Sequence, residues 1–204
     1  GGDFGFDLFR INVKAIHKGI TLNAEYRLYS AVFGGGMLKE GWFGYNSKNR
    51  NTEYQLGLIQ VPFGNQQYNS NNWFFNLPYY IGFEDDHDMG LKIIHKTKFV
   101  DLHVAFLKNA EELTFGNDSP IQPNRYSYDV SGRNKEVNQG NFKLDYKFGK
   151  ERTSKVSIFG EYGGLYNVVT KKMGNHYAYG LALNGTLKRI NVKEIIQLIS
   201  KEER

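Results

Sequence analysis

The sequence predicts an all-β fold whose strands run antiparallel. Apolar and polar residues alternate one by one along several segments, a period that matches an extended strand and not a helix. No stretch approaches the roughly 20 consecutive apolar residues of a membrane-spanning helix. With 14 Tyr and 15 Phe, the chain is too rich in aromatic residues for a disordered protein. It has no cysteine, which excludes disulfides, thiolate zinc sites and thiol catalysis.

Ten strands are expected, most of them longer than the usual globular strand of about five to six residues. Their ranges are 4–16, 20–32, 36–46, 52–62, 89–96, 99–108, 140–149, 155–167, 175–187 and 190–199. Alternation is clearest in four of them. The apolar sets there are Ile20, Leu22, Ala24, Tyr26 and Leu28; Val100, Leu102, Val104 and Phe106; Phe142, Leu144, Tyr146 and Phe148; and Tyr177, Tyr179, Leu181 and Leu183.

Short and long connections alternate along the chain. The short ones are 17–19, 97–98, 149–154 and 188–189, whereas 64–88 and 109–139 are long. In the expected strand order, all of these short connections lie at one end of the sheet and both long ones at the other. Outer-membrane β-barrels are built in this way, and a tilted strand of about 9–11 residues crosses a bilayer. The sequence therefore predicts an antiparallel transmembrane β-barrel.

The alternating pattern has a second interpretation, which differs in what covers the apolar face. In a soluble sandwich or lipocalin-like barrel that face is the core, whereas in a membrane barrel it meets lipid and the polar face lines a wet lumen. Aromatic residues near strand ends, such as Tyr26, Tyr146 and Tyr177, favour the membrane interpretation. The soluble alternative would be a carbohydrate-binding β-sandwich or barrel that uses exposed aromatic residues.

Charged residues on the polar faces are the candidate lining of a pore. Facing each other across a lumen, they would set a field that tunes ion selectivity. Individually, each of them is as well explained by a structural ion pair. The candidates are Arg10, Lys14, Glu25, Arg27, Glu53, Lys92, Lys96, Asp101, Lys143, Asp145, Lys147 and Glu161.

The segment Leu56–Gly64 contains Gly57, Pro62, Phe63 and Gly64 in a G-x-x-x-x-P-F-G pattern. Together with 38–45 before it and with 70–75 and 84–90 after it, this segment resembles the phosphate-selective porin O and P family of bacteria, in its Bacteroidetes form. The resemblance covers roughly residues 4–110. It implies a 16-stranded, homotrimeric outer-membrane channel, of which ten strands would be about two-thirds. Both ends of the chain suggest a piece of such a barrel.

The resemblance also implies that residues 64–88 fold inward as a constriction loop. The candidate residues of this loop are Trp73, Phe74, Tyr79, Glu84, Asp85, Asp86 and Asp88. The segment contains no Lys or Arg, which speaks against phosphate specificity, because anion-selective pores use fixed cations. The acidic run could anchor the loop to basic residues of the lumen, favour permeating cations, or bind a divalent ion. The aromatic residues could pack against the wall or stack on sugars.

Catalysis is not expected, because the five histidines are scattered and no metalloprotease, serine-hydrolase or nucleotide-binding motif is present. No cofactor and no metal site are predicted. The net charge of +5 comes without a basic stretch interleaved with aromatic residues, so nucleic acid is not an expected partner. The expected partners are outer-membrane lipid and small hydrophilic solutes or ions. A purely structural barrel with a plugged lumen is a further alternative.

Overall fold

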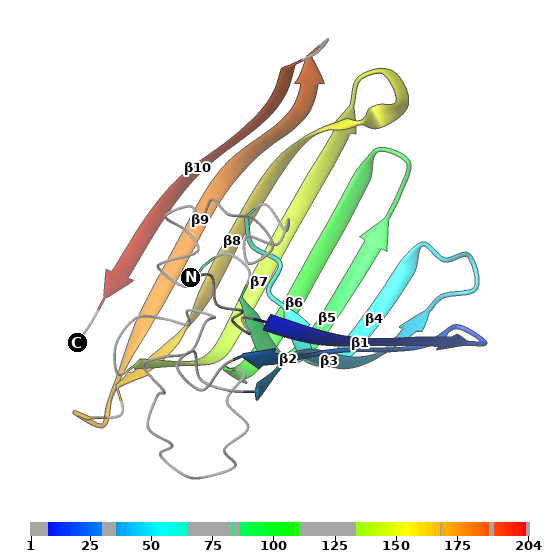
Figure 1. Cartoon of the computed structure of the whole chain (residues 1–204). Helices are drawn as coiled ribbons and strands as arrows, with labels where there is room; N and C mark the ends of the chain where they lie inside the picture. The colour runs from blue at the N-terminus through cyan, green and yellow to red at the C-terminus, as the bar shows by residue number, and fades with distance from the viewer. Residues whose placement is uncertain are drawn as a thin grey trace, which may run out of the picture.

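The computed structural model describes residues 8–29, 36–64, 83, 86–110, 134–167, 169–187 and 190–202. They form one antiparallel sheet of ten strands, in which each strand pairs with the next along the chain (Figure 1). The strands are β1 (Leu8–His17), β2 (Ile20–Tyr29), β3 (Gly36–Asn46), β4 (Thr52–Gln60), β5 (His87–Lys96), β6 (Val100–Ala110), β7 (Asn134–Phe148), β8 (Ser154–Asn167), β9 (Lys172–Leu187) and β10 (Ile190–Glu202), with a 3-10 turn η3 (Lys150–Arg152) between β7 and β8. The predicted all-β antiparallel fold is confirmed.

Each expected strand overlaps an observed one, and the largest difference lies at the start of β7. This strand begins at Asn134, whereas the sequence pattern placed its start at residue 140. The alternation is interrupted because β7 carries a β-bulge, where its register with β8 shifts between Val137 and Gly140. Asn138, inside the bulge, has a φ of 52°. The long connection is correspondingly shorter than predicted and runs over residues 111–133.

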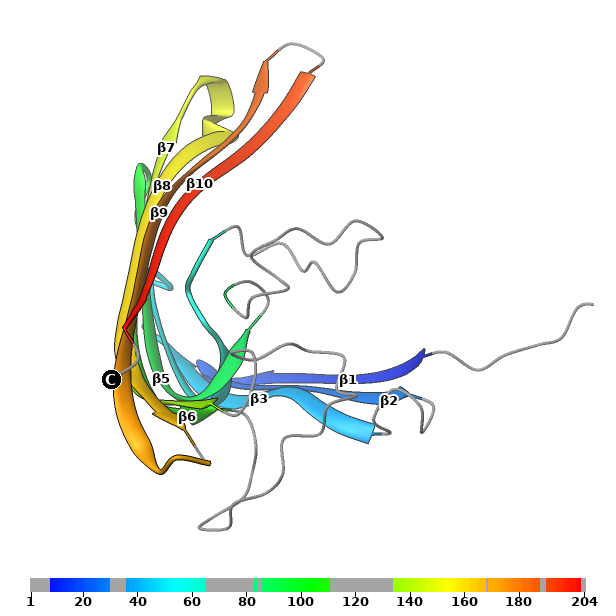
Figure 2. The same cartoon turned by 90° about the vertical axis from the view of Figure 1, so that its left-hand side faces the viewer.

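The sheet is strongly curved, and it is open in the described residues. Figure 2 shows β7–β10 rising as one wall, with β1–β3 leaving it at a steep angle. β1 pairs only with β2 and β10 only with β9, so the two edges of the sheet do not meet. The described part of the chain contains no helix with the length and hydropathy needed to cross a bilayer.

The connections are sorted between the two ends of the sheet, with two exceptions. The links β1–β2, β3–β4, β5–β6, β7–β8 and β9–β10 are short and lie at one end, while the long connections after β4 and β6 lie at the other. Two short links, from Tyr29 to Gly36 and from Asn167 to Lys172, also lie at the end with the long connections. The lengths of the connections therefore differ between the two ends of the sheet less strictly than in the pattern expected for an outer-membrane barrel.

The two faces of the sheet differ sharply in exposure. Apolar side chains of β1–β9 point outward, and Phe43 and Leu56, which are register partners, expose 65% and 62% of their surface. Charged side chains of the same strands lie on the other face, and many of them are buried, with 2% exposed for Arg27 and 1% for Lys143. This arrangement is the reverse of a soluble sheet, where the apolar face is covered.

The buried face lies on the concave side of the sheet, where the chain leaving β4 turns inward (Figure 2). Phe63 packs edge-on against Phe159 of β8, with ring centroids 4.7 Å apart, and lies 5.4 Å from Phe83. Lys143 Nζ of β7 donates a hydrogen bond of 2.6 Å to the carbonyl of Gly64. A small apolar core surrounds this segment, made of Trp42, Ile59, Val61, Phe63, Phe83, Ala105, Leu107, Phe159, Ala178 and Ala182.

Candidate functional site

The β-bulge in β7 brings an additional carboxylate to the concave face. On one side of the bulge, Gln139 and Asn141 occupy this face, opposite Leu107 and Glu161 of the neighbouring strands. Strict alternation would then turn residue 136 outward. Because the bulge inserts an extra residue, Glu136 is instead on the concave face and only 3% exposed.

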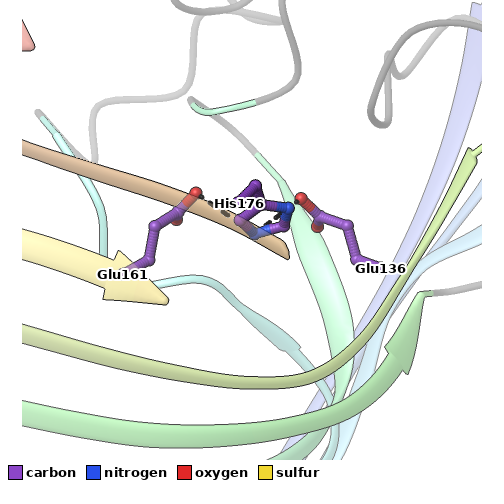
Figure 3. Close-up of side chains that lie close together, drawn as sticks. All are labelled: Glu136, Glu161 and His176. Carbon is purple, nitrogen blue, oxygen red and sulfur yellow. Dashed lines mark ion pairs between the residues drawn. The ribbon is translucent and has the colours of Figure 1, made fainter. Parts of the chain in front are cut away.

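Glu136 meets two buried residues from the adjacent strands, Glu161 of β8 and His176 of β9. The Nε2 atom of His176 lies 3.5 Å from Oε1 of Glu136 and 3.8 Å from Oε1 of Glu161. Figure 3 shows the two carboxylates approaching the imidazole ring from opposite sides. All three side chains are at least nine-tenths buried. One ligand atom of each lies within 4.8 Å of the others, so the three could hold a metal ion.

Two amide side chains of β7 position this cluster. Gln139 Oε1 lies 2.8 Å from the same Nε2 atom of His176. Asn141 Nδ2 donates a hydrogen bond of 3.1 Å to Oε2 of Glu161. Both amides are buried, which restricts their rotamers and therefore fixes the orientation of the imidazole and the carboxylate.

Two aspartates extend the cluster. Asp86 directly precedes β5, and Asp88 is the second residue of this strand. Asp86 and Asp88 are 6% and 1% exposed, and their carboxylates lie within 4.8 Å of that of Glu136. Asp86 Oδ1 accepts a hydrogen bond of 2.8 Å from the backbone N–H of His87. Glu136 is thus shared by two groups of potential metal ligands, one from β7–β9 and one from the segment that enters β5. The four carboxylates and the imidazole of His176 together form the buried carboxylate–histidine cluster.

The predicted pore-lining residues all lie on the concave face, as the cross-strand register shows. Many of them contact one another or the backbone. Arg27 pairs with Glu25, and Lys147 Nζ lies 2.7 Å from Asp101 Oδ1. Asp145 lies between Lys143 at 3.8 Å and Lys155 at 3.1 Å. Lys92 Nζ donates a hydrogen bond of 2.8 Å to the carbonyl of Gln60.

A cavity of about 620 Å³ opens at the end of the sheet with the short connections. The predicted pore-lining residues Lys14 and Glu53 contribute to its wall. Lys18, Lys48 and Arg50 add three further cations, so basic side chains outnumber acidic ones there. Arg10 and Lys96 are not part of this cavity and lie elsewhere on the concave face.

The predicted constriction loop is only partly described. Trp73, Phe74, Tyr79, Glu84 and Asp85 lie outside the described residues. Asp86 and Asp88 belong to the buried carboxylate–histidine cluster. Gly64, where the loop was expected to begin, is held to β7 by Lys143.

The sequence interpretation did not single out Glu136 or His176. Alternation over 175–187 predicts that His176 lies on the polar side of its strand, opposite Tyr177 and Tyr179, but nothing in the sequence distinguishes it from the other four histidines. Glu136 was assigned to the long connection, because the bulge at Asn138 ends the visible alternation. The only sequence signal was the polar run from Asn134 to Asn141, which continues a strand without an alternating apolar set.

No protein-family model, curated protein or solved structure matches this chain. The fold and the site together define an all-β antiparallel sheet with a charged, buried concave face and an apolar, exposed convex face.

Proposed function

We propose that the chain forms part of a porin-like β-barrel in a bacterial outer membrane, where it allows passive diffusion of small hydrophilic solutes or ions. The concave face would line the channel and the convex face would meet lipid. The chain segment entering at Val61–Gly64 would narrow the passage. The homotrimer implied by the porin resemblance belongs to this proposal.

The observation that carries the proposal is the reversed distribution of polar and apolar side chains. A row of register partners, Phe43, Leu56, Leu91 and Phe106, crosses four strands on the convex face, and each exposes more than two-fifths of its surface. Soluble monomers rarely expose continuous apolar patches larger than about 300–600 Å². In a bilayer the same side chains contact hydrocarbon, and the exposed area carries no penalty.

The concave face supplies what a channel for hydrophilic solutes needs. Charged residues of both signs are distributed over it, many of them in pairs such as Lys147 with Asp101. Paired charges leave a hydrated wall with a modest net field, which suits a general pore better than a phosphate-specific one. The basic cavity at the short-connection end would favour anions near that mouth.

The carbohydrate-binding alternative requires the apolar face to form a buried core. The exposure of Phe43 and its register partners on the convex face argues against it. A purely structural barrel shares the lipid-facing surface and differs only in conduction.

The lipid contact can be tested with single nitroxide labels, since the chain contains no native cysteine. Labels would be placed at Phe43→Cys and Leu181→Cys on the convex face, with Asn49→Cys in the exposed β3–β4 turn as the matched control. In lipid vesicles, the two convex labels should be relaxed by oxygen and protected from a water-soluble nickel complex, and the turn label should show the opposite. Free access of the nickel complex to position 43 would refute the membrane proposal.

Conduction requires a separate measurement in planar bilayers. Discrete ohmic steps from the complete barrel that contains this chain, refolded in detergent, would support the pore, and the reversal potential in a salt gradient would give its selectivity. Lys14→Glu replaces a cation of the basic cavity and should shift the reversal potential toward cations. Lipid-protected labels without any steps would instead indicate the structural barrel. A chain that remains monodisperse without detergent would favour the carbohydrate-binding module.

A further inference from the structure

We propose that the buried carboxylate–histidine cluster binds a divalent transition-metal ion, with Glu136, Glu161 and His176 as the primary ligands. The inference goes beyond the channel proposal and does not depend on it, because the site is built from the internal register of β7, β8 and β9. The ion that fits the donor set is Zn²⁺ or Mn²⁺.

The spacing of the donor atoms around His176 Nε2 is the first argument. Three oxygens surround this one nitrogen, from Gln139 at 2.8 Å, Glu136 at 3.5 Å and Glu161 at 3.8 Å. A single N–H can donate well to only one of them. In a tetrahedral site with metal–ligand distances of about 2.0–2.1 Å, neighbouring donor atoms are about 3.3 Å apart. The two carboxylate oxygens, at 3.5 Å and 3.8 Å, lie slightly beyond this value, so a small approach of each would bring it to the spacing of a ligand next to Nε2.

The chemistry of the donors selects the class of ion. One imidazole nitrogen with two carboxylate oxygens suits zinc and the borderline divalent ions, whereas Ca²⁺ and Mg²⁺ prefer oxygen ligands alone. Asp86 and Asp88 adjoin Glu136 and could supply a further oxygen to an ion of higher coordination number, such as Mn²⁺. Burial of every ligand by at least nine-tenths removes competing water from the site.

An outer layer of amide groups supports the ligands. Asn141 orients Glu161 through its Nδ2 atom, an arrangement typical of groups that hold a ligating carboxylate. Within the described part of the chain, Oδ1 of the same buried amide has no hydrogen-bond partner. A water molecule or an ion bound next to Glu161 would satisfy this oxygen, which is an independent indication of a ligand at the cluster.

The site would connect elements that are distant in sequence. Glu136, Glu161 and His176 lie on three neighbouring strands, while Asp86 and Asp88 come from the segment that enters β5. A bound ion would therefore fix this segment against the wall formed by β7–β9. We expect metal binding to raise the thermal stability of the protein, because the ion binds the folded arrangement and not the unfolded chain.

The test uses the full chain in detergent, freed of metal by a chelator and titrated with Mn²⁺. Binding removes the six-line paramagnetic resonance signal of hydrated Mn²⁺, which gives the stoichiometry and the affinity. We expect one ion per chain, displacement by Zn²⁺, and little competition from Ca²⁺ or Mg²⁺. Electron spin-echo modulation of the bound Mn²⁺ should show coupling to a ¹⁴N nucleus of His176. No binding, or bound Mn²⁺ without nitrogen coupling, would overturn the proposal.

Matched variants separate the site from adventitious surface binding. Glu161→Gln should weaken Mn²⁺ binding by at least about tenfold, the effect that follows even from the loss of an outer-layer partner. Glu40→Gln is the control, because Glu40 is a carboxylate of the concave face that pairs with Asn23 on β2, away from the cluster. Equal affinities in both variants and the unmodified chain would refute the assignment. The nitrogen coupling needs no variant, so it decides the question even where Glu161→Gln fails to fold.

Discussion

Replacement of Phe63 by alanine should loosen the inward segment after β4. The Phe63 side chain is 2% exposed and contacts two aromatic rings, at 4.7 Å from Phe159 and 5.4 Å from Phe83. Truncation of a buried phenylalanine to alanine costs about 3–5 kcal/mol, to which each lost ring pair contributes about 0.5–1.5 kcal/mol. Because one side of the cavity is formed by this short segment and not by a rigid strand, partial collapse should keep the loss near the lower end, about 3 kcal/mol.

The assay is equilibrium unfolding by urea in detergent micelles, followed by tryptophan fluorescence. Phe63→Leu is the matched control, since it keeps most of the apolar volume and should cost less than about 1.5 kcal/mol. The difference between the two variants isolates the cavity from a general effect of changing this position. Equal stabilities of Phe63→Ala and Phe63→Leu would refute the packing of this segment against β8.

Three further predictions concern the strands themselves. Asn138→Val should lower the free energy of unfolding by about 1–2 kcal/mol, because a β-branched residue disfavours the φ of 52°. Asn138→Gly should unfold at the same urea concentration as the unmodified chain, because glycine adopts this φ freely. Gly90→Ala should prevent stable pairing of β5 with β6, because the added Cβ would lie 2.2 Å from the carbonyl oxygen of Phe106. Loss of the cooperative urea transition would show this, and an unchanged transition would contradict it. Lys147→Met should cost less than about 1 kcal/mol, because its ion pair with Asp101 is partly exposed, and the small difference should shrink further in high salt.

The regular strands could be predicted because their apolar sets alternate without interruption. Every second residue from Phe142 to Phe148 is apolar and lies on one face of β7, and every second residue from Tyr177 to Leu183 does the same on β9. The turns were equally visible, since short links with Gly or Lys separate these sets. Period-two alternation therefore identifies the strands and, where no bulge interrupts it, the face on which a charged residue lies.

The candidate metal site could not be predicted, because it depends on an irregularity. The bulge at Asn138 reverses the facing of Glu136, and a left-handed asparagine gives no distinct signal in a polar run. His176 was visible as a polar-face residue, yet its neighbours Glu136 and Glu161 come from other strands. Which residues meet across strands depends on register, and register is fixed by the bulges and turns together.

The strand order also determines how the protein can assemble. Every pairing in the sheet joins strands that are consecutive in the chain, so β-hairpins can form one after another, and each adds to an existing edge at a small loss of chain entropy. The hydrogen bond from Lys143 to Gly64 is different, since it joins residues 79 positions apart. The carbonyl oxygen of Gly64 can accept this bond only after β4, β5, β6 and β7 have paired in register, because Lys143 lies on β7. We therefore expect the strands of the sheet to pair early in folding. The inward segment after β4 should pack against the concave face last, in a slow step that buries charged groups.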